Sequence, residues 1–189
     1  MEMRRIGKTE IKISPIALGC WPMGAGYWGR ADDEESIRTI DRALEAGINY
    51  LDTAPAYGHG HSEEVVGRGL KGRRKEAILS TKVAAAPDRI RSSLEASLGR
   101  LQTDYVDICF IHWPKRDAPL SQTMEVLESL REEGRIRAVG VSNFTVEMME
   151  MASKYGTVDV AQPPYNLIWR FIEEDVLPYC RNHGIGTVV

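Results

Sequence analysis

The chain has 189 residues, the length of one domain that can bury a core without metals or disulfides. Its 43% hydrophobic and 27% charged residues are typical of a globular protein, and the net charge of −3 argues against nucleic acid or anionic membranes as partners. No run approaches the ~18 apolar residues of a membrane span and no export signal is visible, so we expect a cytoplasmic protein.

The first predicted element is a small hairpin. Residues 4–6 and 11–13 have alternating character and flank the turn Gly7-Lys8-Thr9. Such a hairpin could plug one end of a barrel.

Behind it, short apolar or β-branched runs alternate with amphipathic stretches, and this order predicts a parallel sheet connected by helices. The predicted strands cover residues 15–20, 49–53, 77–82, 105–112, 136–143, 158–162 and 185–189. The first five strands end near residues 20, 53, 82, 112 and 143, a repeat of about thirty residues that is typical of one β/α unit. A doubly wound sheet would carry G-x-G-x-x-G in its first turn, which residues 19–24 lack. The α/β fold expected is therefore a (β/α)8 TIM-type barrel.

This barrel is expected to be incomplete. Eight units typically need ~250 residues, whereas the sequence provides seven predicted strands and stops inside the seventh. We interpret residues 1–189 as one C-terminally truncated barrel domain. Its first and seventh strands cannot share a hydrogen-bond ladder, so one edge should stay open or be covered by another chain.

The connecting stretches carry helix signals. Two of them have apolar residues at helical spacing, which predicts core-facing stripes: Ile90, Leu94, Leu98 and Leu101, and then Phe171, Ile172, Val176 and Cys180. Polar residues are expected to begin three helices and glycines to end two: Ser62, Ser121 and Thr145, and Gly47 and Gly134. The cysteines are odd in number and lack metal-like spacing, which predicts buried free thiols: Cys20, Cys109 and Cys180.

Three ionisable residues end successive strands at a constant interval. Asp52, Lys82 and His112 are 30 residues apart in turn, and Tyr57 follows Asp52 in its loop. The carboxyl ends of barrel strands form the rim where barrel enzymes hold their active sites. Each residue alone is more often structural, as a turn Asp, a surface Lys, a core Tyr or a satisfied His. Together, four polar residues at corresponding rim positions favour a catalytic set.

Six motifs in chain order make the chain resemble the aldo-keto reductases: LDTAPAYG at 51–58, SEEVVG at 62–67, STK at 80–82, IHWP at 111–114, GVSNF at 140–144 and QPPYN at 162–166. The bacterial branch related to the general stress and inositol-catabolism reductases is the most similar. The resemblance implies an oxidoreductase that reduces aldehydes or ketones to alcohols with hydride from NADPH, and NAD(H) is not excluded.

The resemblance also implies a role for each catalytic residue. Tyr57 would donate the proton, although a free tyrosine with a pKa of ~10 is a reluctant acid. Lys82 would lower the pKa of Tyr57, and Asp52 would pair with Lys82 and fix its position. His112 would donate a hydrogen bond to the substrate carbonyl.

Cofactor contacts are implied at two places. Ser142, Asn143 and Gln162 match positions that hold the nicotinamide carboxamide, which suits side chains with donors and acceptors. The alternative for Ser142 and Asn143 is a strand-ending cap before the next helix. Further cofactor neighbours implied by the match are Gly19, Cys20, Trp21 and Asp52.

The remaining site residues concern substrate and metal. Trp21 and Trp113 could line an apolar substrate pocket. His59 and His61 flank Gly60, but no carboxylate or cysteine completes a zinc pattern, so a solvated loop and no metal are expected.

Two other functions remain open from sequence. Relatives in this family serve as cofactor-binding regulatory subunits of potassium channels, and the chain could also be an inactive fragment of a reductase. In relatives, the aromatic residue that stacks on the nicotinamide and the residues that grip the adenosine phosphate follow the position of Val189, so weak affinity for NADP(H) is expected. The expected small-molecule partner is a carbonyl compound. The oligomeric state is not indicated.

Overall fold

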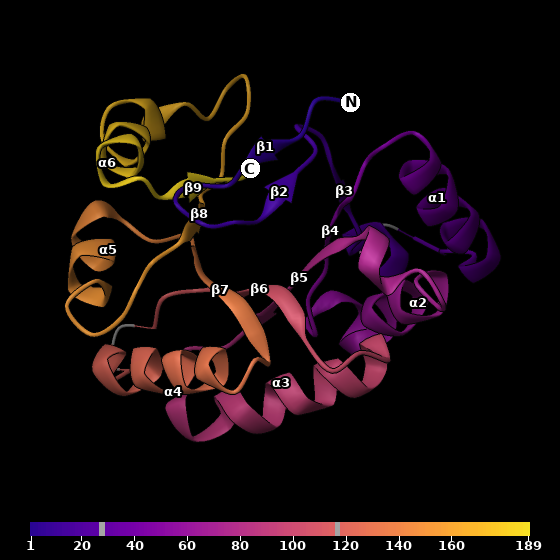
Figure 1. Ribbon diagram of the computed structural model, residues 1–189, viewed down its shortest axis with the longest axis horizontal. Helices are drawn as coiled ribbons and strands as arrows, with labels where there is room; N and C mark the ends of the chain where they lie inside the picture. The colour runs from indigo at the N-terminus through magenta and orange to yellow at the C-terminus, as the bar shows by residue number, and fades with distance from the viewer. Residues whose placement is uncertain (27–28, 116–117) are drawn as a thin grey trace.

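The computed structural model describes residues 1–26, 29–115 and 118–189. Its main feature is a seven-stranded sheet that curls with helices on its outer side (Figure 1). All neighbouring strands in the sheet are parallel, which confirms the predicted arrangement. In order, the strands are β3 (Ala17–Gly19), β4 (Tyr50–Asp52), β5 (Ile78–Val83), β6 (Val106–Ile111), β7 (Ile136–Ser142), β8 (Val160–Gln162) and β9 (Gly186–Thr187).

The sheet does not close within the described residues. β3 and β9 are its two edges, and the expected open edge lies between them. A cavity of about 270 Å³ lies in this region, lined by Ala17, by residues 186–189 and by the N-terminal hairpin. The fold is therefore an incomplete barrel, as the strand count predicted.

The N-terminal hairpin is present as predicted. β1 (Arg4–Arg5) pairs antiparallel with β2 (Lys12–Ile13), and Gly7 in its turn lies against the backbone of Gly186. The hairpin buries apolar side chains with the inner face of the sheet, and this cluster contains Ile6, Ile11, Ile13, Tyr50, Ile108, Phe110, Ala138 and Val160. Because Gly7 also approaches Asp159 and Gly184, which precede β8 and β9, the hairpin plugs the amino end of the barrel.

Side chains alternate between the two faces of the sheet, as the pleat requires. The inward-facing apolar residues Ile108, Phe110 and Ala138 are even-numbered, whereas odd-numbered residues such as Leu79, Cys109 and Val139 pack against the helices. Phe110 and Gly140 are direct partners in the ladder between β6 and β7. The Phe110 ring occupies the space that a side chain at Gly140 would need, since a Cβ there would lie 2.3 Å from the ring.

Six α-helices of the described residues cover the outer face (Figure 1). They are α1 (Asp33–Glu45), α2 (His61–Gly69), α3 (Pro87–Leu101), α4 (Leu120–Glu132), α5 (Val146–Ala152) and α6 (Val176–His183). Short 3-10 turns complete the connections at Trp21–Gly24, Tyr57–Gly60, Arg74–Glu76 and Phe171–Glu173. None of the helices in the described ranges has the length and apolar character needed to cross a membrane.

Most helix signals are confirmed, and two starts are corrected. Thr145 caps α5 by accepting from the Met148 amide. Ser62 lies inside the first turn of α2, where its hydroxyl bonds the Cys20 carbonyl instead of capping. Ser121 likewise lies one residue inside α4, which Pro119 precedes without a side-chain cap. Gly47 and Gly134 end α1 and α4 with positive φ, as predicted.

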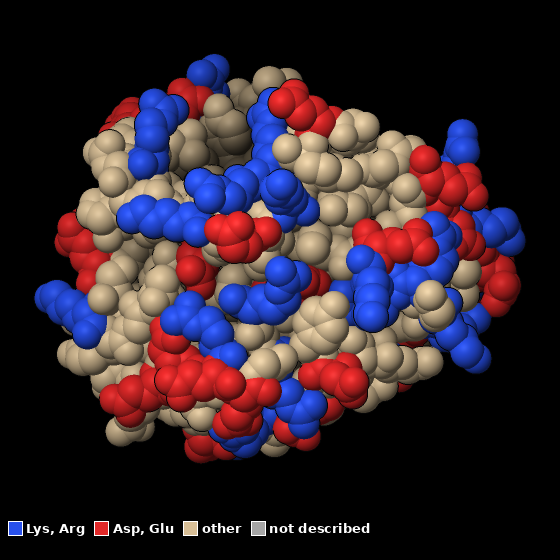
Figure 2. All heavy atoms as spheres, in the orientation of Figure 1, with Lys and Arg blue, Asp and Glu red and all other residues tan. Residues whose placement is uncertain are grey.

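The residues of the two predicted apolar stripes are buried, with one exception. The stripe of α3 is buried throughout, and the cysteines are buried free thiols. Phe171, however, is 70% exposed, because it lies in the 3-10 turn ahead of α6 and only its neighbour Ile172 turns inward. Over the lower part of the face in Figure 2, acidic and basic side chains are interspersed, in keeping with the small net charge.

The contact between Phe110 and Gly140 gives a prediction for stability. Gly140→Ala should lower the free energy of unfolding by roughly 1–3 kcal/mol, because the ring must move in a filled interior. Gly99→Ala is the matched control: nothing lies within 4 Å of a Cβ there, and alanine should stabilise this helical position by roughly 0.5–1 kcal/mol. Urea unfolding measures both. An equal change in the free energy of unfolding in the two variants would contradict the proposed clash at Gly140.

Candidate active site

A cavity of about 560 Å³ lies at the carboxyl ends of the strands. Its lining contains the four residues predicted to be catalytic and five of the other predicted site residues: Asp52, Tyr57, Lys82, His112, Trp21, Trp113, Ser142, Asn143 and Gln162. Asp52, Lys82 and His112 have the same parity as the inward-facing residues of their strands, which is why they point into the mouth of the barrel. The expected convergence on one rim is confirmed.

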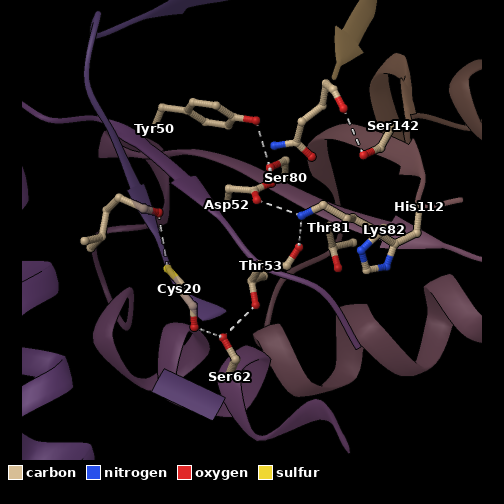
Figure 3. A network of polar contacts seen from close by, with 12 residues as sticks. Cys20, Tyr50, Asp52, Thr53, Ser62, Ser80, Thr81, Lys82, His112 and Ser142 are labelled. Atoms are coloured by element: carbon tan, nitrogen blue, oxygen red, sulfur yellow. Dashed lines mark hydrogen bonds and ion pairs between the residues drawn. The ribbon is translucent and has the colours of Figure 1, made fainter. Parts of the chain in front are cut away.

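A buried ion pair lies at the base of this cavity (Figure 3). The Lys82 Nζ is 2.7 Å from Asp52 Oδ2 and 3.0 Å from the carbonyl oxygen of Thr53. The Lys82 side chain is only 2% exposed. Since a charge removed from water is costly unless it is paired, these two acceptors fix the ammonium in place.

Tyr57 reaches the ion pair from the loop after β4. The Lys82 Nζ lies 5.0 Å from the centre of the Tyr57 ring. The loop is held by a close backbone contact, since a Cβ on Gly58 would lie 1.9 Å from the carbonyl oxygen of Gly24. Trp21, in the same turn as Gly24, stacks on Tyr57 with 5.8 Å between ring centres. The two 3-10 turns thus place Tyr57 over Lys82.

The pKa of Tyr57 differs from the expectation. Burial raises the pKa of the phenol above its ordinary value, while Lys82 lowers it and Asp52 raises it again. The predicted effect of Lys82 is present, but burial outweighs it. The Tyr57 hydroxyl therefore stays protonated at neutral pH and holds a proton to give.

His112 faces Tyr57 across the cavity. Its ring meets the Tyr57 ring edge-on, with 6.0 Å between centres, and it stacks on Trp113 at 6.1 Å. Burial, reinforced by the positive charge of Lys82, lowers the pKa of His112 to about 4. The ring is therefore neutral near pH 7, and a neutral imidazole has one N–H to donate.

Asn143 links His112 to the end of β7 by hydrogen bonds. It has left-handed backbone geometry with φ of 63°, which asparagine tolerates better than most residues. Its Nδ2 donates to the His112 carbonyl and to Ser142 Oγ, each at 3.0 Å. Ser142 Oγ in turn donates to the Gln162 carbonyl at 3.0 Å. Asn143 and Gln162 both line the cavity, and the amide groups of their side chains offer both donors and acceptors.

Two predicted cofactor neighbours do not line the cavity. Gly19 ends β3 behind it, and the Cys20 thiol is fully buried and points to the Leu18 carbonyl, 3.5 Å away. Burial raises the pKa of Cys20 far above its ordinary value, so the thiol is inert.

Sequence reasoning missed the residues that hold Asp52. Ser80 Oγ donates to Asp52 Oδ1 at 2.6 Å, and the Tyr50 hydroxyl lies 3.0 Å from Ser80 Oγ. Ser80 belongs to the STK motif at 80–82, but its role depends on the ladder between β4 and β5, in which Asp52 and Ser80 are direct partners. The strand register, which sequence alone does not fix, would have revealed it.

No group of three or more metal-ligating residues occurs in the described ranges. His59 is exposed. His61 departs from the expected solvated state, because its Nε2 lies 2.8 Å from Asp33 Oδ1, an ion pair when the ring is protonated.

Comparison with known proteins identifies this arrangement. The model of the aldo/keto reductase family matches residues 15–189. The chain belongs to this family. It is 45% identical to the aldo-keto reductase YhdN of Bacillus subtilis, covering 100% of the chain and 61% of that protein. It is 36% identical to an NADH-specific methylglyoxal reductase of Escherichia coli, covering 97% of the chain and 65% of that protein.

Solved aldo-keto reductases have the same fold. The holo form of one from Bacillus halodurans superposes with a TM-score of 0.92 at 33% identity, covering 100% of this chain and 65% of that one. One from Klebsiella pneumoniae in complex with NADPH gives 0.89 at 34% identity, covering 98% and 66%. This aldo-keto reductase chain thus spans less than two thirds of the length of these relatives.

The lowered pKa of His112 can be measured directly. The His112 ring proton resonances in ¹H NMR should titrate near pH 4 and stay constant between pH 6 and 8, because burial and Lys82 disfavour the imidazolium. Lys82→Met removes the second of these causes and should move the transition to higher pH. His112→Gln assigns the signal. A transition near the ordinary value of 6.5 in the unaltered chain would show a hydrated ring.

Proposed function

We propose that this chain carries the carbonyl-reducing site of an aldo-keto reductase, which converts aldehydes or ketones to alcohols with Tyr57 as proton donor. The observation that carries the proposal is the position of the Lys82 ammonium. It lies between the Asp52 carboxylate and the Tyr57 ring, at the base of a cavity that His112 also lines.

Each residue has a chemical task that its surroundings support. Reduction of a carbonyl develops negative charge on oxygen, and a proton from the Tyr57 hydroxyl neutralises that charge. The phenolate left behind is stabilised by the nearby Lys82 cation, since opposite charges in a water-poor site attract strongly. Asp52 holds Lys82 at the required place.

His112 orients the substrate. Its ring is neutral, so it donates one hydrogen bond to the carbonyl oxygen without competing with Tyr57 as an acid. The two rings are perpendicular, with centres 6.0 Å apart, and both residues line the cavity in which a carbonyl oxygen would lie. Two donors converging on one oxygen both polarise the carbonyl and fix the face that is attacked.

A reduced nicotinamide, when bound, supplies the hydride. The donor and acceptor set at the rim fits its carboxamide, because Asn143 and Gln162 carry amide side chains and line the cavity, while Ser142 holds the Gln162 backbone. We propose NADP(H) as the cofactor, on the precedent of the Klebsiella pneumoniae complex. NAD(H) stays within the proposal because the Escherichia coli relative is described as NADH-specific.

The substrate is proposed to be a small carbonyl compound. Trp21 and Trp113, which are 43% and 61% exposed, line the cavity and favour apolar groups beside the carbonyl. Methylglyoxal is a suitable first substrate to assay, since the Escherichia coli relative is described as a methylglyoxal reductase.

Replacement of Tyr57 by phenylalanine tests the proposal. Tyr57→Phe keeps the ring and removes the donor, so methylglyoxal turnover with NADPH should fall by roughly two to four orders of magnitude. Affinity for NADPH, measured by protein fluorescence, should change little. Tyr165→Phe is the control, because that hydroxyl bonds Glu173 outside the cavity. Near-normal turnover by Tyr57→Phe would exclude Tyr57 as the acid. Absence of carbonyl turnover in the unaltered protein would favour a cofactor-binding role if NADPH still binds, and an inactive fragment if NADPH does not bind.

A further inference from the structure

A hydrogen-bonded chain inside the barrel ends on the catalytic ion pair (Figure 3). It runs from the Tyr50 hydroxyl through Ser80 Oγ to Asp52 Oδ1, and the other oxygen of Asp52 pairs with Lys82. Tyr50 and Ser80 are buried and do not line the cavity at the barrel mouth. They therefore contact no substrate.

The chemistry of Asp52 fixes the direction of the chain. An ionised carboxylate only accepts hydrogen bonds, so Ser80 must donate its single hydroxyl proton to Asp52. Ser80 Oγ then accepts from Tyr50, whose phenol is kept protonated because burial raises its pKa. Donation by Tyr50 strengthens Ser80 as a donor, since hydrogen bonds in series polarise one another.

The two oxygens of Asp52 are held from different directions. Ser80 and Lys82 follow each other on the same face of β5, and they bond Oδ1 and Oδ2 at 2.6 and 2.7 Å. Without the hydrogen bond from Ser80, the Asp52 carboxylate can rotate about its side-chain torsions, and Lys82 can move with it. Lys82 has a second acceptor in the Thr53 carbonyl, so it would keep one hydrogen bond but move relative to Tyr57.

We propose that Ser80, backed by Tyr50, is a positioning residue that orients the Asp52 carboxylate and thereby sets the place of the Lys82 ammonium beside Tyr57. This inference rests on the proposed function of Tyr57 as the acid. The opposing interpretation is that Tyr50 and Ser80 are a satisfied polar pair in the core with no effect on the site.

Stability and activity separate the two interpretations. Ser80→Ala removes the donor to Asp52 and leaves the buried Tyr50 hydroxyl without a partner, which destabilises the fold. Tyr50→Phe leaves Ser80 able to donate to Asp52. The double variant Tyr50→Phe/Ser80→Ala removes both polar groups, so it should recover stability relative to Ser80→Ala while it still lacks the donor.

The experiment measures the three variants by urea unfolding and by steady-state reduction of methylglyoxal with NADPH. Ser80→Ala should lower kcat roughly 10- to 100-fold with little change in KM, the scale expected for a misplaced group. Tyr50→Phe should have a smaller effect. The double variant should match Ser80→Ala in kcat but exceed it in stability. Ser97→Ala is the control, since Ser97 is equally buried and bonds only Arg100.

A pH titration gives a readout that a purely structural role would not move. Without the Ser80 dipole, the negative charge of Asp52 acts more strongly on Tyr57, so the alkaline limb of kcat against pH should shift to higher pH in Ser80→Ala. The same shift should occur in the ultraviolet tyrosinate titration, where Tyr57→Phe identifies the Tyr57 transition. Ser97→Ala should leave both unchanged.

These measurements also distinguish failure of the inference from failure of the proposed function. Unchanged kcat and an unchanged Tyr57 transition in Ser80→Ala would overturn the positioning role. Recovery of kcat together with stability in the double variant would do the same, because activity would then follow stability alone. If the unaltered protein reduces no carbonyl, the proposed function fails, while the tyrosinate titration still decides whether Ser80 acts on Tyr57.

Discussion

The buried pair of Lys82 and Asp52 is the constraint on which the rest of the site depends. An ammonium 2% exposed to solvent is tolerated only because Asp52 and the Thr53 carbonyl accept its protons. That geometry requires β4 and β5 to be parallel and in one register, with Asp52 directly opposite Ser80. The sheet therefore makes the ion pair possible, and a slip of one residue would turn Lys82 to the outer face.

The two ends of the barrel use polar groups differently. At the amino end, buried carboxylates bind the backbone of a neighbouring strand: Asp107 accepts from the Leu79 amide and Asp159 from the Val139 amide. Both also pair with arginines on the outer side. The hydrogen bonds and ion pairs of these two carboxylates therefore stabilise the fold. At the carboxyl end the ionisable groups face a cavity, which matches the general division in barrels between a stability face and a chemical face.

Sequence predicted the framework well because its signals are local. Strand ends, the hairpin and the spacing of Asp52, Lys82 and His112 follow from periodicity and turn residues. Ser62 was misassigned as a helix start because the same residue type serves as a cap or as a buried donor, and only the packing of α2 against Cys20 decides which. The direction in which the pKa of Tyr57 finally moves is hidden from sequence for a related reason: the lowering effect of Lys82 can be predicted, but the extent of burial cannot.

The contact of the hairpin with the segment around β9 has a consequence for how the molecule folds during synthesis. Gly7 packs against the backbone of Gly184 and Gly186, so the hairpin can dock only after residues 184–186 have emerged from the ribosome. The hairpin stays undocked until then, whereas β4 to β8 can pair earlier because each pairs with the next strand in the sequence. Its apolar side chains, Ile6 and Ile11 among them, stay uncovered during that interval. Long-range closure of this kind is slow, which makes the unplugged barrel the stage most exposed to chaperones and proteases.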